Sequence, residues 1–278
     1  MRELVRTSAA QWNLSPRTAT WIFWAPILGA VLMLVARLDK DIYRFLLTDD
    51  GPIEWMQFGF FLLATLAGAL VSWQRFRAGH VVQGALFAIF AMGMTFVTGE
   101  EISWAQRVLD FETPEQLAEI NTQDEATLHN IGGVLPTINI VMMMACFLGA
   151  AAYFVNRKVQ IERYWADANF LLVPPPFLAP AFLVPALYKL VRFTVLTEPG
   201  FTITKYGEWG ELCFAFALFA FAGLNYRRLA AQAKEAAAPI VPANLEASAE
   251  AMMTGSAETP QNGGGSSVTA PEPDSHSA

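Results

Sequence analysis

Acidic side chains stand at the ends of apolar segments, and they are the residues of this chain best suited to chemistry. The stretch "GEEISWAQR" (99–107) follows a long apolar run and contains two adjacent glutamates, Glu100 and Glu101. Carboxylates act as general acids and bases, and grouped with a histidine they bind divalent metals. Two carboxylates at a helix C-terminus also oppose the helix dipole. We therefore expect an arginine or a metal ion as their partner, the alternative being a simple helix end marked by an interfacial tryptophan.

If the helix continues through this stretch, Glu100, Ser103 and Arg107 lie on one stripe of its surface. Downstream, "INTQDEATLHN" (120–130) places His129 at the start of another apolar run. Imidazole changes charge near neutral pH, which suits it to proton transfer, although a lone histidine often has a structural role. The catalytic residues that we predict are Glu100, Glu101, Arg107 and His129.

Two further acidic groups begin apolar runs elsewhere in the chain. Glu54 and Gln57 are three residues apart and share a helix face, as do Glu208 and Glu211. The substrate-binding residues that we predict are Glu54, Gln57, Ser103, Trp104, Glu208 and Glu211.

A weak internal repeat relates two of these groups. Residues 43–51 resemble residues 191–200, and a Glu-Trp pair follows each segment, although the match requires gaps. A true repeat would place Glu54 and Glu208 at similar depths in related positions.

The composition predicts which elements position these residues. The chain is 54% hydrophobic, with a mean hydropathy of +0.35, and only 15% of its residues are charged, against about 25% in globular proteins. Six apolar runs approach the length that spans a bilayer. They cover roughly residues 20–38, 53–73, 82–99, 131–155, 170–192 and 208–226. We expect an all-α, polytopic membrane helix bundle with about six transmembrane helices and a short interfacial helix near residue 115, after a capping-box pattern that starts at Thr113.

The fifth run contains five prolines between residues 174 and 185. An interior proline removes a backbone donor and kinks a helix. The pattern is therefore compatible with a kinked helix packed in the bundle or with a broken helix that lines a cavity.

Basic residues predict the orientation of the chain. Eleven of the 18 Lys and Arg residues lie on the side that holds both termini, and seven lie on the other side. The positive-inside rule then places both termini in the cytoplasm. We expect a cytoplasmic segment at 1–19, the transmembrane domain at 20–228, and a disordered cytoplasmic tail at 229–278, which is rich in Ala, Ser, Gly and Pro.

Three segments, "DDGPIEW" (49–55), "GEEISWAQR" and "INTQDEATLHN", resemble a family of bacterial polytopic membrane proteins to which we can attach no activity. The resemblance covers roughly residues 40 to 215. It implies a shared architecture and a location in the bacterial cytoplasmic (inner) membrane, and it implies no reaction.

Ionisable residues at membrane depth favour a function at the end of the bundle where they gather. Our first reading is an enzyme that acts on a membrane lipid or lipid-linked substrate at the outer leaflet. The alternatives are an accessory protein that binds a membrane protein partner there, and a transporter or proton-coupled component, which the apolar mid-span positions disfavour. No HExxH or repeated histidine spacing occurs, so support for a divalent metal is weak and the cofactor is unknown. No basic patch suggests nucleic-acid binding.

Overall fold

The computed structural model describes residues 2–48, 51–109, 111–121, 126–128, 131, 134–165, 167–196 and 200–237. Regular structure in these ranges is helical, apart from one isolated bridge between Asn121 and Ile131. The long helices are α2 (Pro16–Ala36), α4 (Pro52–Arg77), α5 (Val81–Glu101), α8 (Val134–Val159), α10 (Ala179–Thr194) and α11 (Phe201–Ala237). The shorter elements are α1 (Arg2–Gln11), α3 (Lys40–Leu47), η1 (Ser103–Ala105), α6 (Gln106–Leu109), α7 (Glu115–Ala118), η2 (Ile161–Arg163), α9 (Ala168–Leu171) and η3 (Pro176–Leu178).

Six segments are long and apolar enough to cross a membrane, which confirms the predicted all-α multi-pass bundle. α11 continues to Ala237, beyond residue 228, where we expected the transmembrane domain to end. The predicted tail from residue 238 onwards lies outside the described residues. The predicted segment 1–19 contains α1, a helix that its hydropathy does not indicate.

Short polar signals explain where several helices begin. The Ser15 hydroxyl accepts a hydrogen bond from the Thr18 backbone amide at 3.1 Å, and Pro16 follows as the first residue of α2. The Asp39 carboxylate caps α3 by accepting from the amides of Asp41 and Ile42. The Asp39 cap lets α3 start at Lys40, four residues after α2 ends at Ala36.

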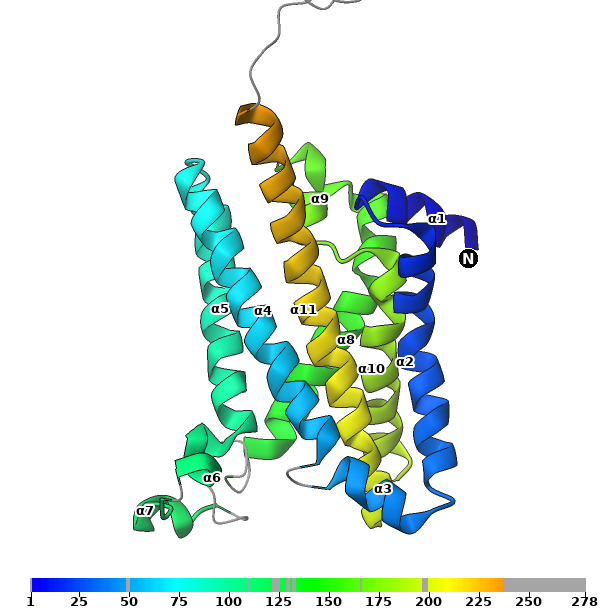
Figure 1. Ribbon diagram of the computed structural model, residues 1–278, viewed down its shortest axis with the longest axis vertical. Coiled ribbons are helices and arrows are strands. Elements are labelled where there is room, and N and C mark those ends of the chain that lie inside the picture. Colours follow the sequence, from blue (N-terminus) through cyan, green and yellow to red (C-terminus); the bar gives the residue numbers. More distant parts are fainter. Residues whose placement is uncertain are drawn as a thin grey trace, which may run out of the picture. The chain divides into compact units, whose positions relative to one another are not determined.

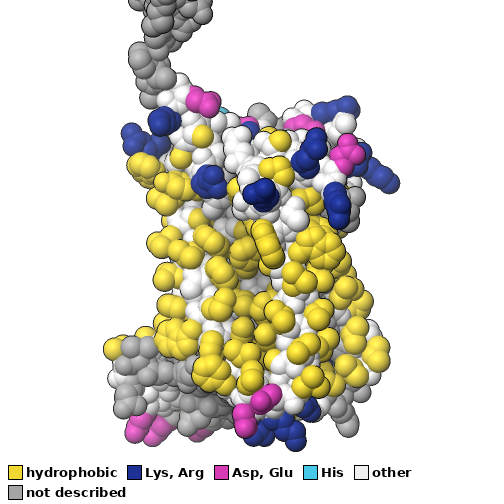
Figure 2. Space-filling view, turned by 45° about the vertical axis from the view of Figure 1, so that its right-hand side comes forward, with side chains coloured by type: hydrophobic (Ala, Val, Ile, Leu, Met, Phe, Trp, Pro, Cys, Tyr) yellow, Lys and Arg dark blue, Asp and Glu magenta, His cyan; other side chains and the backbone are white. Residues whose placement is uncertain are grey.

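The two ends of the bundle carry different short elements (Figure 1). α3, α6 and α7 lie at one end, which we call the α3 end, and α1 and α9 lie at the other, which we call the α1 end. Figure 2 shows a band of hydrophobic side chains between the ends, with Lys and Arg gathered more densely at the α1 end. This distribution is the one that a bilayer imposes on a multi-pass protein.

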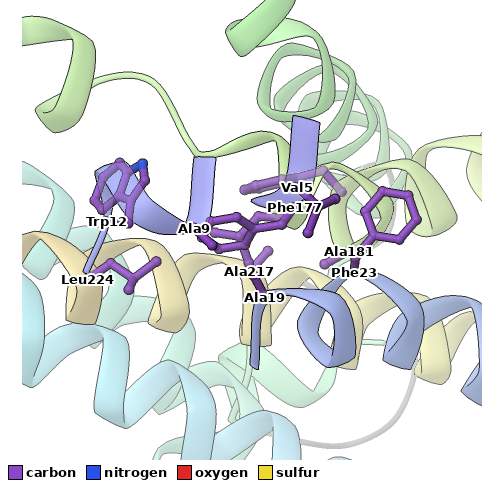
Figure 3. Packing of buried hydrophobic residues seen from close by; sticks show 11 residues of the cluster. Val5, Ala9, Trp12, Ala19, Phe23, Phe177, Ala181, Ala217 and Leu224 are labelled. Atoms are coloured by element: carbon purple, nitrogen blue, oxygen red, sulfur yellow. The ribbon is translucent and has the colours of Figure 1, made fainter. Parts of the chain in front are cut away.

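A hydrophobic cluster joins α1, α2, η3, α10 and α11 near the α1 end (Figure 3). Ala9 of α1 and Trp12, the residue after that helix, pack with Phe23 of α2, Phe177 of η3 and Ala217 of α11. Because α1 contributes to this cluster, the N-terminal helix is part of the packed bundle.

Aromatic and polar contacts join α11 to α2 and α4. The Trp209 indole donates to the Pro26 carbonyl at 3.2 Å, and its ring lies against Gly29, where an added Cβ would be 1.9 Å from the ring. On α4, the Phe60 ring stacks with Phe219 of α11 at 5.7 Å between centroids. α11 therefore packs between the first and second spans, although it comes last in the chain.

α10 is continuous from Ala179 to Thr194 and contains Pro185 within the helix. Pro174 and Pro175 precede it, and Pro176 begins η3. The prolines thus shorten the fifth span at its start, and the helix itself is not broken at Pro185.

Candidate functional site

α5 ends at Glu101, and the chain then makes a left-handed turn. Ser103, Trp104 and Ala105 have φ values of 48°, 54° and 67°, a region that residues other than glycine rarely adopt. The Trp104 ring folds back over Gly99, where an added Cβ would be 2.8 Å from it. Because of this turn, the helix does not continue through 103–107, and the expected stripe of Glu100, Ser103 and Arg107 does not form.

Glu100 anchors the segment that follows this turn. Its side chain is buried; one carboxylate oxygen accepts from the Trp104 indole at 2.6 Å and the other accepts from the Leu128 amide at 2.8 Å. Gln106 acts similarly, since its amide group donates to the Thr113 hydroxyl at 2.8 Å and accepts from the Ala126 amide at 2.6 Å. Thr113 lies just before α7, so its hydrogen bond to Gln106 connects the start of α7 to α6.

Glu101 lies among carboxylates from other helices. It interacts electrostatically with Glu211, Glu208, Glu54 and Glu100. These residues come from the start of α4, the end of α5 and the first half of α11. We call Glu54, Glu100, Glu101, Glu208 and Glu211 the acidic layer; it brings together carboxylates that are up to 157 positions apart in the chain.

Gln57 connects α4 to α11 within the acidic layer. Its side chain is only 1% exposed, and its amide nitrogen donates to the Glu208 carbonyl at 2.7 Å and to the Glu208 carboxylate at 3.2 Å. The Glu208 carboxylate also lies 3.6 Å from the Lys205 ammonium, one turn earlier on the same helix. Glu208 is therefore held by a neutral donor from one side and by a cation from the other.

A buried lysine that we did not predict as a site residue completes this region. Lys189 of α10 is 4% exposed; its ammonium donates to the Asn139 side-chain oxygen at 2.6 Å and to the Glu211 carboxylate at 3.0 Å. The three residues join α8, α10 and α11. A lysine inside an apolar span is itself a signal of a functional or paired site, but the sequence does not identify its partner.

Lys189 and Asn139 lie inside their apolar helices, in the half of the bundle nearer the α3 end. Lys189 is five residues before the last residue of α10, and Asn139 is five residues after the first residue of α8, so each lies about 7.5 Å along its helix at 1.5 Å per residue. Both residues are therefore about two helical turns or less from the α3 end.

The structure places the predicted residues as follows. Glu54, Gln57, Glu208 and Glu211 come together with Glu101, while Ser103 is buried in the turn and Trp104 is 45% exposed. The side chain of Arg107 and all of His129 lie outside the described residues. Among the residues that are described, no three His, Cys, Asp or Glu side chains are arranged to hold a metal ion.

Comparison with protein families, curated proteins and solved structures gave no match for this chain. The function is therefore inferred from the geometry of the acidic layer and its surroundings.

Proposed function

We propose that this chain is a multi-pass enzyme of the bacterial inner membrane that acts on a lipid or lipid-linked substrate at its α3 end. The observation that carries the proposal is the contact of Gln57 on α4 with Glu208 on α11, close to Glu54 and Glu101. Carboxylates are costly at membrane depth, and a bundle stabilised only by packing does not require them there. Their grouping at one end, within reach of headgroups, is what a site for an amphipathic substrate requires.

The surroundings of the carboxylates divide them into two kinds. Glu100 and Glu211 have partners that fix them: the Trp104 indole and Leu128 amide for the first, and the Lys189 ammonium for the second. Glu101 instead lies near other carboxylates, on α4, α5 and α11. We assign Glu101 as the general base, which accepts a proton from an attacking hydroxyl group or water.

The other residues of the site keep the binding and catalytic roles that the sequence predicts for them, and Lys189 is added. Glu54, Gln57 and Glu208 bind polar groups of the substrate, and Glu211 with Lys189 forms the fixed wall of the site. Arg107 and His129 are proposed to stabilise developing negative charge and to return a proton to the leaving group.

Charge distribution supports an outer-leaflet location for the site. Seven of the 18 basic residues lie on the side of the α3 end and eleven on the other side. The positive-inside rule assigns the richer side to the cytoplasm, so the acidic layer faces outwards.

The proposal is tested with the full-length protein purified in detergent and incubated with a total lipid extract of a bacterial inner membrane. Mass spectrometry of the lipids before and after incubation should show a species consumed and a product formed. Glu101→Gln should abolish this conversion, while Glu112→Gln, a change of an exposed carboxylate in the loop after α6, should leave it intact. An unchanged lipid profile with wild-type protein, across extracts with and without added Mg²⁺ or Zn²⁺, would refute an enzyme of this kind.

A further inference from the structure

Three cations converge on a pocket at the α3 end, on the side formed by α2, α3 and α11. Arg37, Lys40 and Arg44 line a cavity of about 220 Å³, which Tyr43, Phe201 and Thr202 complete. In the described part of the chain, none of the three cations forms an ion pair with a carboxylate. The pocket is therefore positively charged and able to accept an anion.

Contacts between the helices hold this pocket in shape. The Arg37 guanidinium donates through Nε to the Thr202 hydroxyl at 2.9 Å, and its two terminal nitrogens make no hydrogen bond among the described residues. The Tyr43 hydroxyl donates to the Thr202 carbonyl at 2.7 Å, which fixes α3 against α11. Arg44 lies 6.0 Å from the Phe201 ring centroid. Planar guanidinium groups with free terminal nitrogens are the side chains that best fit a phosphate.

An apolar pocket of about 190 Å³ adjoins the basic pocket and shares Arg37, Tyr43 and Thr202 with it. Its other walls include Met33 and Leu34 of α2, which precede Arg37 by about one helical turn, or about 5.4 Å along the axis. The polar pocket is thus at the helix end and the apolar pocket is deeper in the membrane. This is the order of polarity along a phospholipid, from headgroup to chain.

We propose that these two joined pockets bind an anionic phospholipid, with its phosphate against Arg37, Lys40 and Arg44 and the upper part of an acyl chain in the apolar pocket. α3 supports this position, because Ile42 and Phe45 are 51% and 68% exposed on a helix whose other face is packed against the bundle. A short amphipathic helix of this kind lies in the headgroup region.

The residues that line the two pockets are different from those of the acidic layer. Tyr206 lines the apolar pocket, and Glu208, two residues later, belongs to the acidic layer. At about 100° per residue the two side chains are about 200° apart around α11, although Tyr188, which also lines the apolar pocket, lies near Glu208 and Glu211. The inference therefore does not depend on the proposed enzymatic function.

The test is native mass spectrometry of the full-length protein in detergent with added lipid. Phosphatidylglycerol should remain bound to the wild-type protein and phosphatidylcholine should not. The double variant Arg37→Gln/Arg44→Gln should weaken retention by about fivefold for each cation removed. Arg2→Gln/Arg6→Gln, which removes the same charge from exposed positions on α1, should leave it unchanged. If Arg37→Gln impairs folding, Lys40→Gln/Arg44→Gln provides the same comparison without breaking the contact to Thr202.

A second arm distinguishes a lipid from free phosphate. Ile203→Trp, which fills the apolar pocket, should reduce phosphatidylglycerol retention in a protein with an unchanged melting temperature. Equal retention of both lipids, or equal loss in the α1 control, would overturn the proposal. Saturable binding of inorganic phosphate with no effect of Ile203→Trp on lipid retention would overturn the assignment to a lipid.

Discussion

The Lys189 ammonium lies 3.0 Å from the Glu211 carboxylate, in a contact that joins α10 to α11 across 22 residues of sequence. The lysine side chain is 5% exposed and the glutamate side chain is 36% exposed. The pair therefore joins a buried cation to a partly exposed carboxylate. This asymmetry lets Lys189 fix Glu211 while the carboxylate remains a partly exposed member of the acidic layer.

Removal of Glu211 alone should destabilise the protein strongly. Glu211→Leu leaves the buried Lys189 ammonium with Asn139 as its recorded partner, and breaking one side of a buried ion pair costs about 3 kcal/mol or more. Lys189→Met/Glu211→Leu should recover most of the loss, because no buried charge remains. Tryptophan fluorescence during heating in detergent measures the melting temperatures. A double variant that melts no higher than Glu211→Leu would contradict this account.

The Gln57 amide should contribute measurable stability. Gln57→Leu removes its hydrogen bonds to Glu208 and should cost about 1 to 2 kcal/mol. Gln74 on the same helix provides a matched control, because its side-chain oxygen is buried without a hydrogen-bond partner in the described region. Gln74→Leu should leave the melting temperature unchanged or raise it. Equal losses of melting temperature in Gln57→Leu and Gln74→Leu would show that the hydrogen bonds of Gln57 add no stability.

Glu100 should control the mobility of the segment before α8. Glu100→Ala removes the acceptors for the Trp104 indole and the Leu128 amide, each a hydrogen bond to a charged group worth about 1.5 to 3 kcal/mol. Hydrogen–deuterium exchange at residues 126–131 should accelerate on the order of tenfold or more. Exchange in α2 should not change. Unchanged exchange at 126–131 would show that Glu100 does not anchor this segment.

Hydropathy predicted the six spans because a bilayer selects strongly for length and composition. The same signal could not predict α3, which is short and amphipathic, or the left-handed turn at Ser103–Ala105, since positive φ values in three non-glycine residues have no local signature. A similar depth for Glu54 and Glu208 was expected only if the weak repeat is real, and it stays a prediction. The partner of Lys189 was not predictable, because it depends on how α8, α10 and α11 pack.

Reporter fusions test the orientation on which the outer-leaflet location depends. Fusions after Arg77 and Arg228 should report the cytoplasm, and a fusion after Asn121 should report the outside. The charge difference between the two sides is the physical reason for this expectation. The reverse pattern would place the acidic layer in the cytoplasmic leaflet and remove the proposed access to outer-leaflet lipids.

The central claim is that carboxylates from different helices form one site. It is tested most directly by the rate of lipid conversion in Glu101→Gln, Glu208→Gln and the double variant, each with an unchanged melting temperature. If the residues act as a unit, each single change should lower the rate by about a hundredfold or more and the double change should be no slower than the slower single variant. Near-normal rates in both single variants, or small effects that simply multiply in the double variant, would contradict a shared site.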